Sequence, residues 1–506
     1  MRSQRDGRGR YQKWDGASAL RAEDGDLENG ARDIDASIPS TETPGDFPES
    51  SPPPPPRRWL LWGKRIGRAA LWLGAFTGLI ALFVLALFRL FPPAASPVSK
   101  EPGAKRVLLV SLDGFRADYL DRQERPPTAG VRRASVSRTA ADSTYLAPNL
   151  RQLAARGFRA AYLEPVFPTK TFPNHQSIIT GQYPESHGVV DNVFYDPVLN
   201  ETFNMGHLEE RFWGGEPLWA TLRRQGRVTA AYDWPGSEVT YRQTWKRPHA
   251  HAGPFNASRP YAERVRQIIE WYERGVVDDQ GKLQVPDLVA VYLEPVDHAG
   301  HLYGPDSLAV SMAIAEVDQV LGTLVSGVRQ ALASRADRLH VIVVSDHGMA
   351  AVDDQRRVAL NATHAAAAEL YQRMAQVAKG AAGHVRAYTQ DSMEERWHLK
   401  GSRRVAPVSV LASTGWRLVY DEDAEAASRQ PRHAWGDHGY DNIEPKMRAL
   451  FVADGPTFRR NAGDAPDRQP VLRNVDVYEI VCTLLGAQPA PNNGSRDAVA
   501  QVLRSA

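Results

Sequence analysis

The chain has 506 residues, of which 42% are hydrophobic and 24% charged, a composition typical of a globular protein with a sizeable core. Its 61 basic and 59 acidic residues give a net charge of only +2, so a nucleic-acid polymer is not expected as a partner. The single cysteine, Cys482, excludes an intramolecular disulfide, which fits a bacterial envelope protein or a cytosolic one better than a secreted animal enzyme. Because Cys482 lies in an apolar run, we expect it to be a small core residue.

The N-terminal part is predicted to anchor the chain in a membrane. Residues 1–63 mix charges with Ser, Gly and Pro and are expected to form a disordered cytoplasmic tail. Residues 64–91 contain an uncharged apolar stretch long enough to cross a bilayer as a signal-anchor transmembrane helix. Basic residues crowd the N-terminal side of this stretch, so the positive-inside rule places the chain beyond the stalk at 92–104 outside the cytoplasm. The expectation is a single-pass inner membrane protein whose catalytic domain is periplasmic or extracellular.

The exported part is predicted to be an α/β domain. Short apolar runs rich in β-branched residues at 106–112, 287–293 and 339–345 indicate strands buried on both faces, as in a mostly parallel sheet. Helical patterns lie between them, at 147–157 and at 307–332. Strands that alternate with helices predict a central, mostly parallel sheet flanked by helices.

Acidic residues follow each of the three predicted strands. Asp113 and Asp346 come directly after the first and third strands, and Asp297 follows the second. An isolated Asp-Gly after a strand is usually a turn, but three carboxylates at one edge of a sheet repel each other unless cations neutralise them. His301 and His347 accompany two of these aspartates and favour zinc or a similar transition metal.

Thr171 precedes Phe172 and Pro173 in a stretch whose prolines and glycine are expected to resist a regular helix start. A threonine hydroxyl attacks poorly at neutral pH until a metal or base lowers its pKa, and a carboxylate-bound metal at the sheet edge would supply that activation.

Several longer motifs resemble one known family. The segments SLDGFRADYL, PTKTFPNHQSIITGQYPESHGVVDN, DWPGSEV, EPVDHAGHLYGP, VSDHGM and WGDHGYDN occur in the order found in nucleotide pyrophosphatases/phosphodiesterases, a branch of the alkaline phosphatase superfamily. The resemblance implies an alkaline phosphatase-like sandwich and a catalytic phosphodiesterase domain over residues 105–495.

The resemblance also implies the roles of the site residues. Two Zn²⁺ per chain would be bound, one by Asp297, His301 and His438 and the other by Asp113, Asp346 and His347 together with the Thr171 oxygen. Thr171 would attack phosphorus and form a covalent intermediate, while the Asn192 amide would stabilise a phosphate oxygen. His175 and His187 belong to the same motifs but are not implied to be ligands.

The family cleaves nucleotides or choline phospholipids, and the expected partner is a small nucleotide or other phosphodiester. Phe172 matches the residue that stacks on a base in nucleotide-cleaving relatives, and Phe255 is the apparent opposing aromatic. Trp234 and Tyr303 lie in matching motifs and would shape the same pocket.

Three other functions are compatible with parts of this pattern. A phosphomonoesterase needs extra positive charge, for which Arg116 is the only arginine within the metal-site motifs. A phospholipid phosphodiesterase of the same superfamily is the second alternative. An inactive binding module on a membrane stalk is the third, although such proteins usually lose a ligand or the nucleophile. No role follows from the sequence for residues 374–404.

Overall fold

The computed structural model describes residues 104–123, 145–241, 244–353, 356–360, 367–380, 383–420, 435–461 and 468–504. The predicted tail, transmembrane helix and nearly all of the predicted stalk lie outside these residues, so nothing in the structure bears on them.

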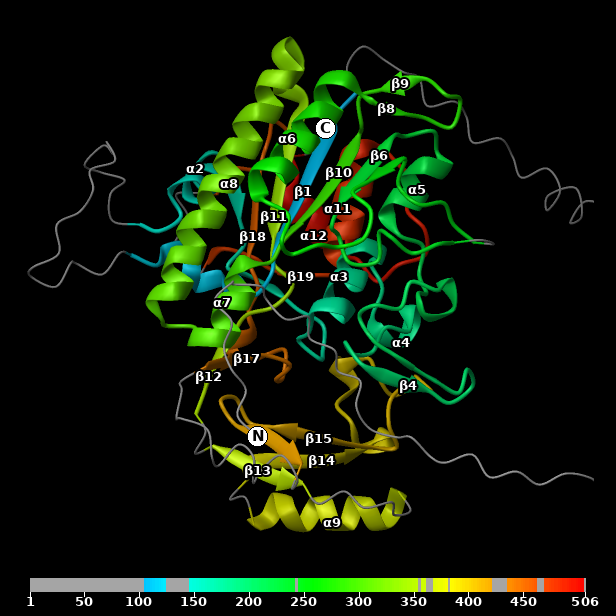
Figure 1. The fold of residues 1–506 in the computed structure, drawn as a ribbon, viewed down its shortest axis with the longest axis vertical. Coiled ribbons are helices and arrows are strands. Elements are labelled where there is room, and N and C mark those ends of the chain that lie inside the picture. The colour runs from blue at the N-terminus through cyan, green and yellow to red at the C-terminus, as the bar shows by residue number, and fades with distance from the viewer. Residues whose placement is uncertain are drawn as a thin grey trace, which may run out of the picture. The chain divides into compact units, whose positions relative to one another are not determined.

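A seven-stranded sheet forms the centre of the domain (Figure 1), and it is mostly parallel, as predicted. β1 runs parallel to both of its neighbours, β10 and β11, whereas β18 pairs antiparallel with both β11 and β2 and so runs opposite to the other strands of this sheet. The strands in sheet order are β2 (Phe158–Arg159), β18 (Phe451–Asp454), β11 (Leu339–Val344), β1 (Arg106–Leu112), β10 (Leu288–Leu293), β6 (Thr229–Tyr232) and β7 (Ala250–His251).

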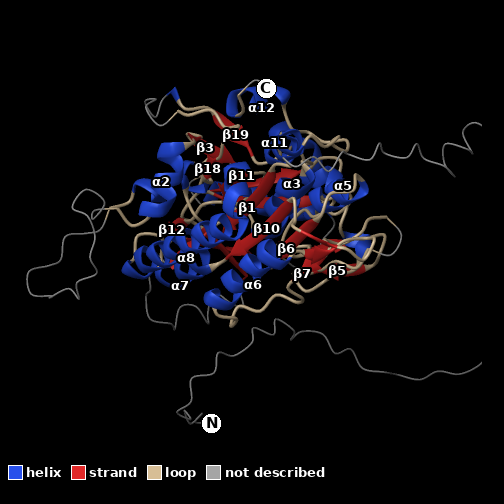
Figure 2. Ribbon diagram, turned by 90° about the horizontal axis from the view of Figure 1, so that it is seen from above, coloured by secondary structure: helices blue, strands red, loops and turns tan. Residues whose placement is uncertain are grey.

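The strand sequences are apolar on both faces because helices cover both faces of the sheet (Figure 2). In β1, Leu108 and Val110 enter one hydrophobic core, whereas Val107 and Leu109 enter the other. The first core is completed by α2 (Pro148–Arg156), α6 (Tyr261–Arg274), α7 (Pro295–Tyr303) and α8 (Leu308–Leu332). The second is completed by α3 (Thr171–Thr180), α5 (Leu218–Arg224), α11 (Asp476–Leu485) and α12 (Arg496–Val502).

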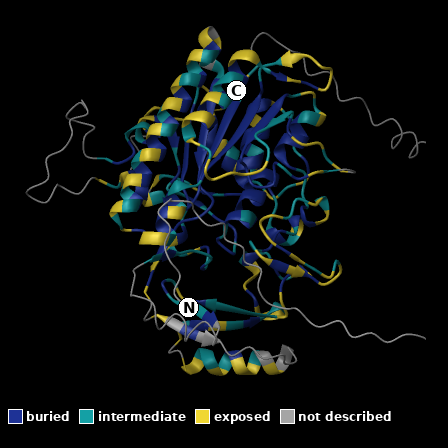
Figure 3. Cartoon of the chain, viewed as in Figure 1, coloured by how far each residue is buried: buried dark blue, intermediate teal, exposed yellow. Residues whose placement is uncertain are grey.

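The helix α8 begins where its sequence indicates. Ser307 caps it by accepting a hydrogen bond from the backbone N–H of Val310. Among the described residues α8 alone is long and apolar enough to cross a membrane, but its apolar face packs against the sheet and its exposed face points outward (Figure 3). We therefore interpret it as a core helix. Cys482, in α11, is fully buried in the second core, as expected.

Residues 374–404, which had no predicted role, belong to a small lobe. Its parts are a parallel pair, β13 (Arg357–Leu360) with β16 (Arg417–Tyr420), an antiparallel pair, β14 (Val385–Thr389) with β15 (Val408–Ala412), and α9 (Ala367–Gly380). Trp397 of this lobe stacks on Phe167 with ring centroids 4.3 Å apart, and Arg396 donates to Asp441. The segment is therefore packed against the loop that precedes α3 and the loop that follows His438.

The remaining elements are short. They are β3 (Tyr162–Glu164) with β19 (Val471–Arg473), β4 (Phe194–Asp196) with β5 (Glu201–Phe203), β8 (Val276–Val277) with β9 (Leu283–Gln284), β12 (Ala350–Val352) with β17 (Trp435–Asp437), α4 (Pro184–His187), and the 3-10 helices Ala117–Asp121, Glu210–Phe212, Ala333–Arg338, Gln390–Ser392, Glu395–Trp397 and Pro445–Met447.

Candidate metal centre and active site

Three carboxylates meet at the carboxyl edge of the sheet. Asp113 follows β1, Asp346 follows β11, and Asp297 lies in the first turn of α7, directly beyond β10. Because β1 lies between β10 and β11, the three chain segments converge. The backbone N–H of Gly114 donates to Asp346 Oδ1 at 3.1 Å, and Gly114 has a φ of +64°. A Cβ at this position would stand 2.9 Å from Asp297 Cα, so the close approach requires glycine.

Three histidines face these carboxylates. His301 lies one turn after Asp297 on α7, His347 follows Asp346, and His438 follows β17, which pairs with β12. Each histidine donates its Nδ1 proton to a backbone carbonyl oxygen: His301 to Gly436 (3.0 Å), His347 to Gly348 (2.9 Å) and His438 to Thr169 (2.7 Å). In neutral imidazoles this pattern leaves the Nε2 lone pairs free to bind a metal.

The His301 and His438 Nε2 atoms are 3.0 Å apart. Two nitrogens whose lone pairs face each other repel at this distance, unless a proton or a cation lies between them. Within the described part of the chain, the residues that could hold a cation form two groups of mutually close ligand atoms: Asp297, His301 and His438, and Asp113, Asp297 and His347. Asp297 belongs to both groups, which the sequence did not indicate.

Buried, unpartnered oxygens test whether this site fits a cation. Asp113 Oδ1, Asp297 Oδ1 and Asp346 Oδ2 are buried and accept no hydrogen bond from any described residue. Asp346 Oδ2 lies 3.1 Å from His347 Nε2, Asp113 Oδ1 lies 3.4 Å from the same nitrogen, and Asp297 Oδ1 lies 3.6 Å from His438 Nε2. Buried carboxylate oxygens are normally hydrogen-bonded or bound to metal, so the donor set fits a metal ion.

The pKa shifts of the candidate ligands also fit a site that binds a cation. Burial, followed by the charges of Asp346 and Asp297, raises the pKa of Asp113 well above its usual value. Burial also raises the pKa of Asp297, whereas for Asp346 the effect of burial is outweighed by His347 and a second histidine, which lower its pKa. Burial and the neighbouring histidines depress the pKa of His438 well below its usual value. A cation would stabilise these carboxylates in their charged form and would bind a neutral imidazole at His438.

Thr171 lies beside the second group of ligands. Its Oγ1 is 3.4 Å from His347 Nε2, and the side chain is almost completely buried. The expectation that this stretch resists a helix start is wrong, because Thr171 is the first residue of α3. Pro173 is tolerated there since the first backbone N–H groups of a helix have no intrahelical partner. The helix N-terminus favours negative charge on the Thr171 oxygen.

Asn192 is held next to Thr171. Its Oδ1 accepts a hydrogen bond from the backbone N–H of Phe172 at 2.9 Å, which leaves its amide N–H groups as donors beside the threonine. The Phe172 ring is half-buried and lies 5.8 Å from the Trp213 ring.

The other predicted substrate contacts have different surroundings. Phe255 is 45% exposed, and its ring lies 6.0 Å from that of Tyr292. Tyr303 is exposed at the end of α7, two residues beyond His301. Trp234 requires a correction, because it is fully buried and therefore cannot line an open pocket. It packs edge-on against His175, behind the site.

Sequence reasoning missed two residues that support the site. The Tyr292 hydroxyl donates to Asp113 Oδ2, although its strand reads only as an apolar run. The tyrosine next to the end of that strand, with a polar atom among aliphatic residues, was the available signal. His175 Nδ1 donates to the Thr171 carbonyl oxygen and its Nε2 contacts Ser111 Oγ at 2.9 Å, so it is a structural partner.

Arg116 does not supply charge to a phosphate. Its guanidinium donates to both carboxylate oxygens of Asp118 and to the Met349 carbonyl oxygen, and only 5% of the residue is exposed. The guanidinium that a monoesterase would need beside the phosphate is therefore already hydrogen-bonded to other protein groups.

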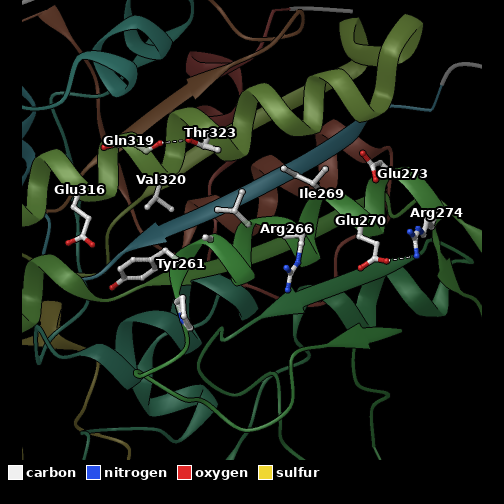
Figure 4. Close-up of a pocket in the computed structure, with 13 residues that line it drawn as sticks. Tyr261, Arg266, Ile269, Glu270, Glu273, Arg274, Glu316, Gln319, Val320 and Thr323 are labelled. Atoms are coloured by element: carbon white, nitrogen blue, oxygen red, sulfur yellow. Dashed lines mark hydrogen bonds and ion pairs between the residues drawn. The ribbon is translucent and has the colours of Figure 1, made fainter. Parts of the chain in front are cut away.

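A groove between α6 and α8 is separate from this site (Figure 4). It is lined by residues of those two helices, including Tyr261, Arg266 and Glu316, and by none of the predicted site residues. No ligand chemistry follows from its lining.

Comparison with known proteins identifies the family. A family model described as type I phosphodiesterase / nucleotide pyrophosphatase matches residues 129–375 and 354–441. The chain belongs to this family. It is accordingly a hydrolase of the phosphodiesterase and nucleotide pyrophosphatase class, as the resemblance of its motifs implied.

Individual members of the family match over most of the chain. An uncharacterized pyrophosphatase/phosphodiesterase of Schizosaccharomyces pombe is 31% identical over 88% of this chain and 91% of its own length. A bis(5'-adenosyl)-triphosphatase of Xenopus laevis is 31% identical over 77% of this chain and 80% of its own length. Murine ectonucleotide pyrophosphatase/phosphodiesterase 5 has been solved as an inactive threonine-to-alanine variant in complex with AMP. Its structure superposes on this one with a TM-score of 0.65 at 29% identity, and the match covers 79% of this chain and 100% of the murine chain.

Proposed function

We propose that this family member is a two-zinc phosphodiesterase/pyrophosphatase that hydrolyses nucleotide phosphodiester or pyrophosphate bonds through a covalent phospho-threonine at Thr171. The observation that carries the proposal is the set of buried, unpartnered oxygens of Asp113, Asp297 and Asp346, which face imidazole nitrogens beside the Thr171 hydroxyl.

The residues that would hold the metal follow from the donor atoms. One zinc would be held by Asp297, His301 and His438, and the other by Asp113, Asp346 and His347, next to the Thr171 oxygen. Nitrogen donors favour zinc over magnesium or calcium. When bound, zinc supplies positive charge that stabilises phosphate oxygens and lowers the pKa of a hydroxyl group.

Protein side chains would carry out the nucleophilic attack and stabilise the phosphate oxygens. Thr171 Oγ loses its proton to solvent and attacks phosphorus, and the bond from phosphorus to the leaving oxygen breaks. The Asn192 amide donates to a phosphate oxygen during this step. Water then cleaves the phospho-threonine and restores the hydroxyl. The inactivity of the murine threonine-to-alanine variant supports a threonine nucleophile in this family.

Nucleotides are the proposed substrates. The AMP bound to the murine relative and the diadenosine substrate in the name of the Xenopus relative support this class. Phe172 and Phe255 are the proposed stacking surfaces for a base, with Tyr303 at the rim, and stacking stabilises a bound base by roughly 1–3 kcal/mol.

We also propose that residues 64–91 anchor the enzyme in the membrane and that the catalytic domain, residues 105–495, lies outside the cytoplasm. The support is the uncharged apolar stretch and its basic N-terminal flank.

Paired assays test the function. The purified chain should cleave the nitrophenyl ester of thymidine monophosphate faster than nitrophenyl phosphate, lose activity in chelator and regain it with zinc. Elemental analysis should find about two zinc atoms per chain. Thr171→Ala should lower turnover by about 1,000-fold or more while zinc stays bound. A clear preference for nitrophenyl phosphate, or full activity in chelator, would contradict the proposal.

A further inference from the structure

Asp113 and Asp346 each have one carboxylate oxygen that the protein already occupies. Asp113 Oδ2 accepts a hydrogen bond from the Tyr292 hydroxyl group. Asp346 Oδ1 accepts from two backbone N–H groups, that of Gly114 at 3.1 Å and that of His347 at 2.9 Å. The protein therefore restricts both carboxylates to a single free oxygen.

The two free oxygens lie around the same imidazole nitrogen as the Thr171 hydroxyl group. Asp113 Oδ1 and Asp346 Oδ2 are buried and accept no hydrogen bond from any described residue. They lie 3.4 and 3.1 Å from His347 Nε2, and Thr171 Oγ1 lies 3.4 Å from the same nitrogen. His175 Nδ1 lies 3.5 Å from Asp346 Oδ2, but it donates its proton to the Thr171 carbonyl oxygen at 2.8 Å. Two carboxylate oxygens and one hydroxyl oxygen are therefore gathered around one imidazole nitrogen.

The number of free donor atoms fits one zinc ion with a position left for Thr171, because zinc in proteins mostly has four ligands. Asp113, Asp346 and His347 supply three donors if each carboxylate gives one oxygen. One position then remains for the Thr171 oxygen. A carboxylate that bound through both of its oxygens would fill this position itself. Backbone N–H groups prevent this at Asp346, whereas at Asp113 it depends on a single side chain, that of Tyr292.

We infer that Tyr292 is a positioning residue, whose hydroxyl group restricts Asp113 to one ligand oxygen and so keeps the remaining ligand position for the nucleophile, Thr171. This inference rests on the proposed function and gives a role to a residue outside the ligand set. The Tyr292 ring is buried and packs edge-on against His175 and Phe255, with ring centroids 5.1 and 6.0 Å apart. Because the ring is held on both sides, its hydroxyl group is fixed against Asp113.

The Tyr292→Phe variant tests the inference, because it removes only the hydroxyl group. Asp113 Oδ2 is then free to bind the cation, so the chain should still hold about two zinc atoms while kcat falls by about tenfold or more and KM changes by less than about twofold. Tyr272→Phe is the matched control, since Tyr272 is also buried but its hydroxyl group has no hydrogen-bond partner among the described residues. The control should leave zinc content, kcat and KM unchanged.

The visible absorption spectrum of the cobalt(II)-substituted chain gives a readout independent of turnover, because it reports the ligands and geometry around the ion. Thr171→Ala should shift this spectrum in the otherwise unsubstituted chain but change it little in the Tyr292→Phe background, where Asp113 has already taken the position. Equal spectral shifts in the two backgrounds, loss of one zinc atom from Tyr292→Phe, or an unchanged kcat would overturn the assignment. Failure of the proposed function is distinguishable, since the unsubstituted chain would then bind no pair of zinc ions or cleave no nucleotide ester.

Discussion

The histidines at and beside the candidate metal centre differ in what their Nε2 atoms contact. His175 and His187 reach serine hydroxyl groups, at 2.9 Å in both cases. The Nε2 atoms of His301, His347 and His438 instead face carboxylate oxygens at distances of 3.5, 3.1 and 3.6 Å. A serine satisfies an imidazole completely, whereas a carboxylate across a free lone pair requires a cation. This difference in partners separates structural histidines from candidate ligands within one set of motifs.

At the residue scale, His187 predicts a pH dependence of stability. Burial, aided by Arg404, lowers its pKa to about 3 in the folded chain, compared with 6.5 for the free side chain. Between these values the unfolded chain binds the additional proton, so the free energy of unfolding falls as pH decreases below 6.5, by up to about 1.4 kcal/mol per pH unit. His187→Gln should flatten this dependence. Urea titrations at pH 7.5 and pH 5 measure both chains, and parallel losses in the two would contradict this origin.

At the element scale, the start of α7 is held by an arginine from α6. Arg264 is 1% exposed and donates to both carboxylate oxygens of Glu294, at 2.8 and 3.0 Å, just before the turn that carries Asp297. It also lies 3.4 Å from Asp233, whose pKa burial raises to about 6. Its Nη2 also donates to the carbonyl oxygen of Asn256, next to Phe255, at 3.3 Å. One side chain therefore connects the candidate metal ligands to a candidate substrate contact.

Removal of this arginine should be costly. Arg264→Met removes the buried cation shared by Glu294 and Asp233 and should lower the free energy of unfolding by about 3 kcal/mol or more, as well as weakening zinc binding. Arg266→Met is the control, because Arg266 lies on the same helix but faces the groove in Figure 4, and it should change stability by less than about 0.5 kcal/mol. Chemical denaturation and zinc titration measure both effects. Similar losses in the two variants would argue against the assigned network.

The elements also show which features the sequence could reveal. Three strands of the central sheet, β1, β10 and β11, and the helix α8 were predictable because apolar runs and helical patterns act locally. The start of α3 was misjudged, since Pro173 is a breaker only in helix interiors. The small lobe was not recognised because its strands are short and Trp397 packs on the distant Phe167. For the site, the ligand types were readable, whereas the role of Tyr292 depends on register across the sheet.

At the scale of the whole molecule, the metal centre joins three strand ends of the central sheet with His438, which follows β17 much later in the chain. Without cations, the carboxylates of Asp113, Asp297 and Asp346 repel each other in a buried site. Ligands that bind only the folded state stabilise it by mass action. Chelation should therefore lower the apparent Tm by about 5 °C or more, and zinc should restore it. Calorimetry with and without chelator checks this, and an unchanged Tm would speak against a metal that stabilises the fold.

The pairing of β12 with β17 determines where the chain can tolerate changes in sequence and length. Val352 and Trp435 are direct partners in that antiparallel pair, so the chain leaves the catalytic core and returns to it at adjacent points. The small lobe between them is thus an insertion whose two ends already meet as the stem of a hairpin. Because its ends are held together, changes of length within the lobe away from its contacts with the core should have a low entropic cost, while the stem continues to deliver His438 to the same place. Diversification at this junction would alter what surrounds the substrate without rebuilding the chemistry beneath it.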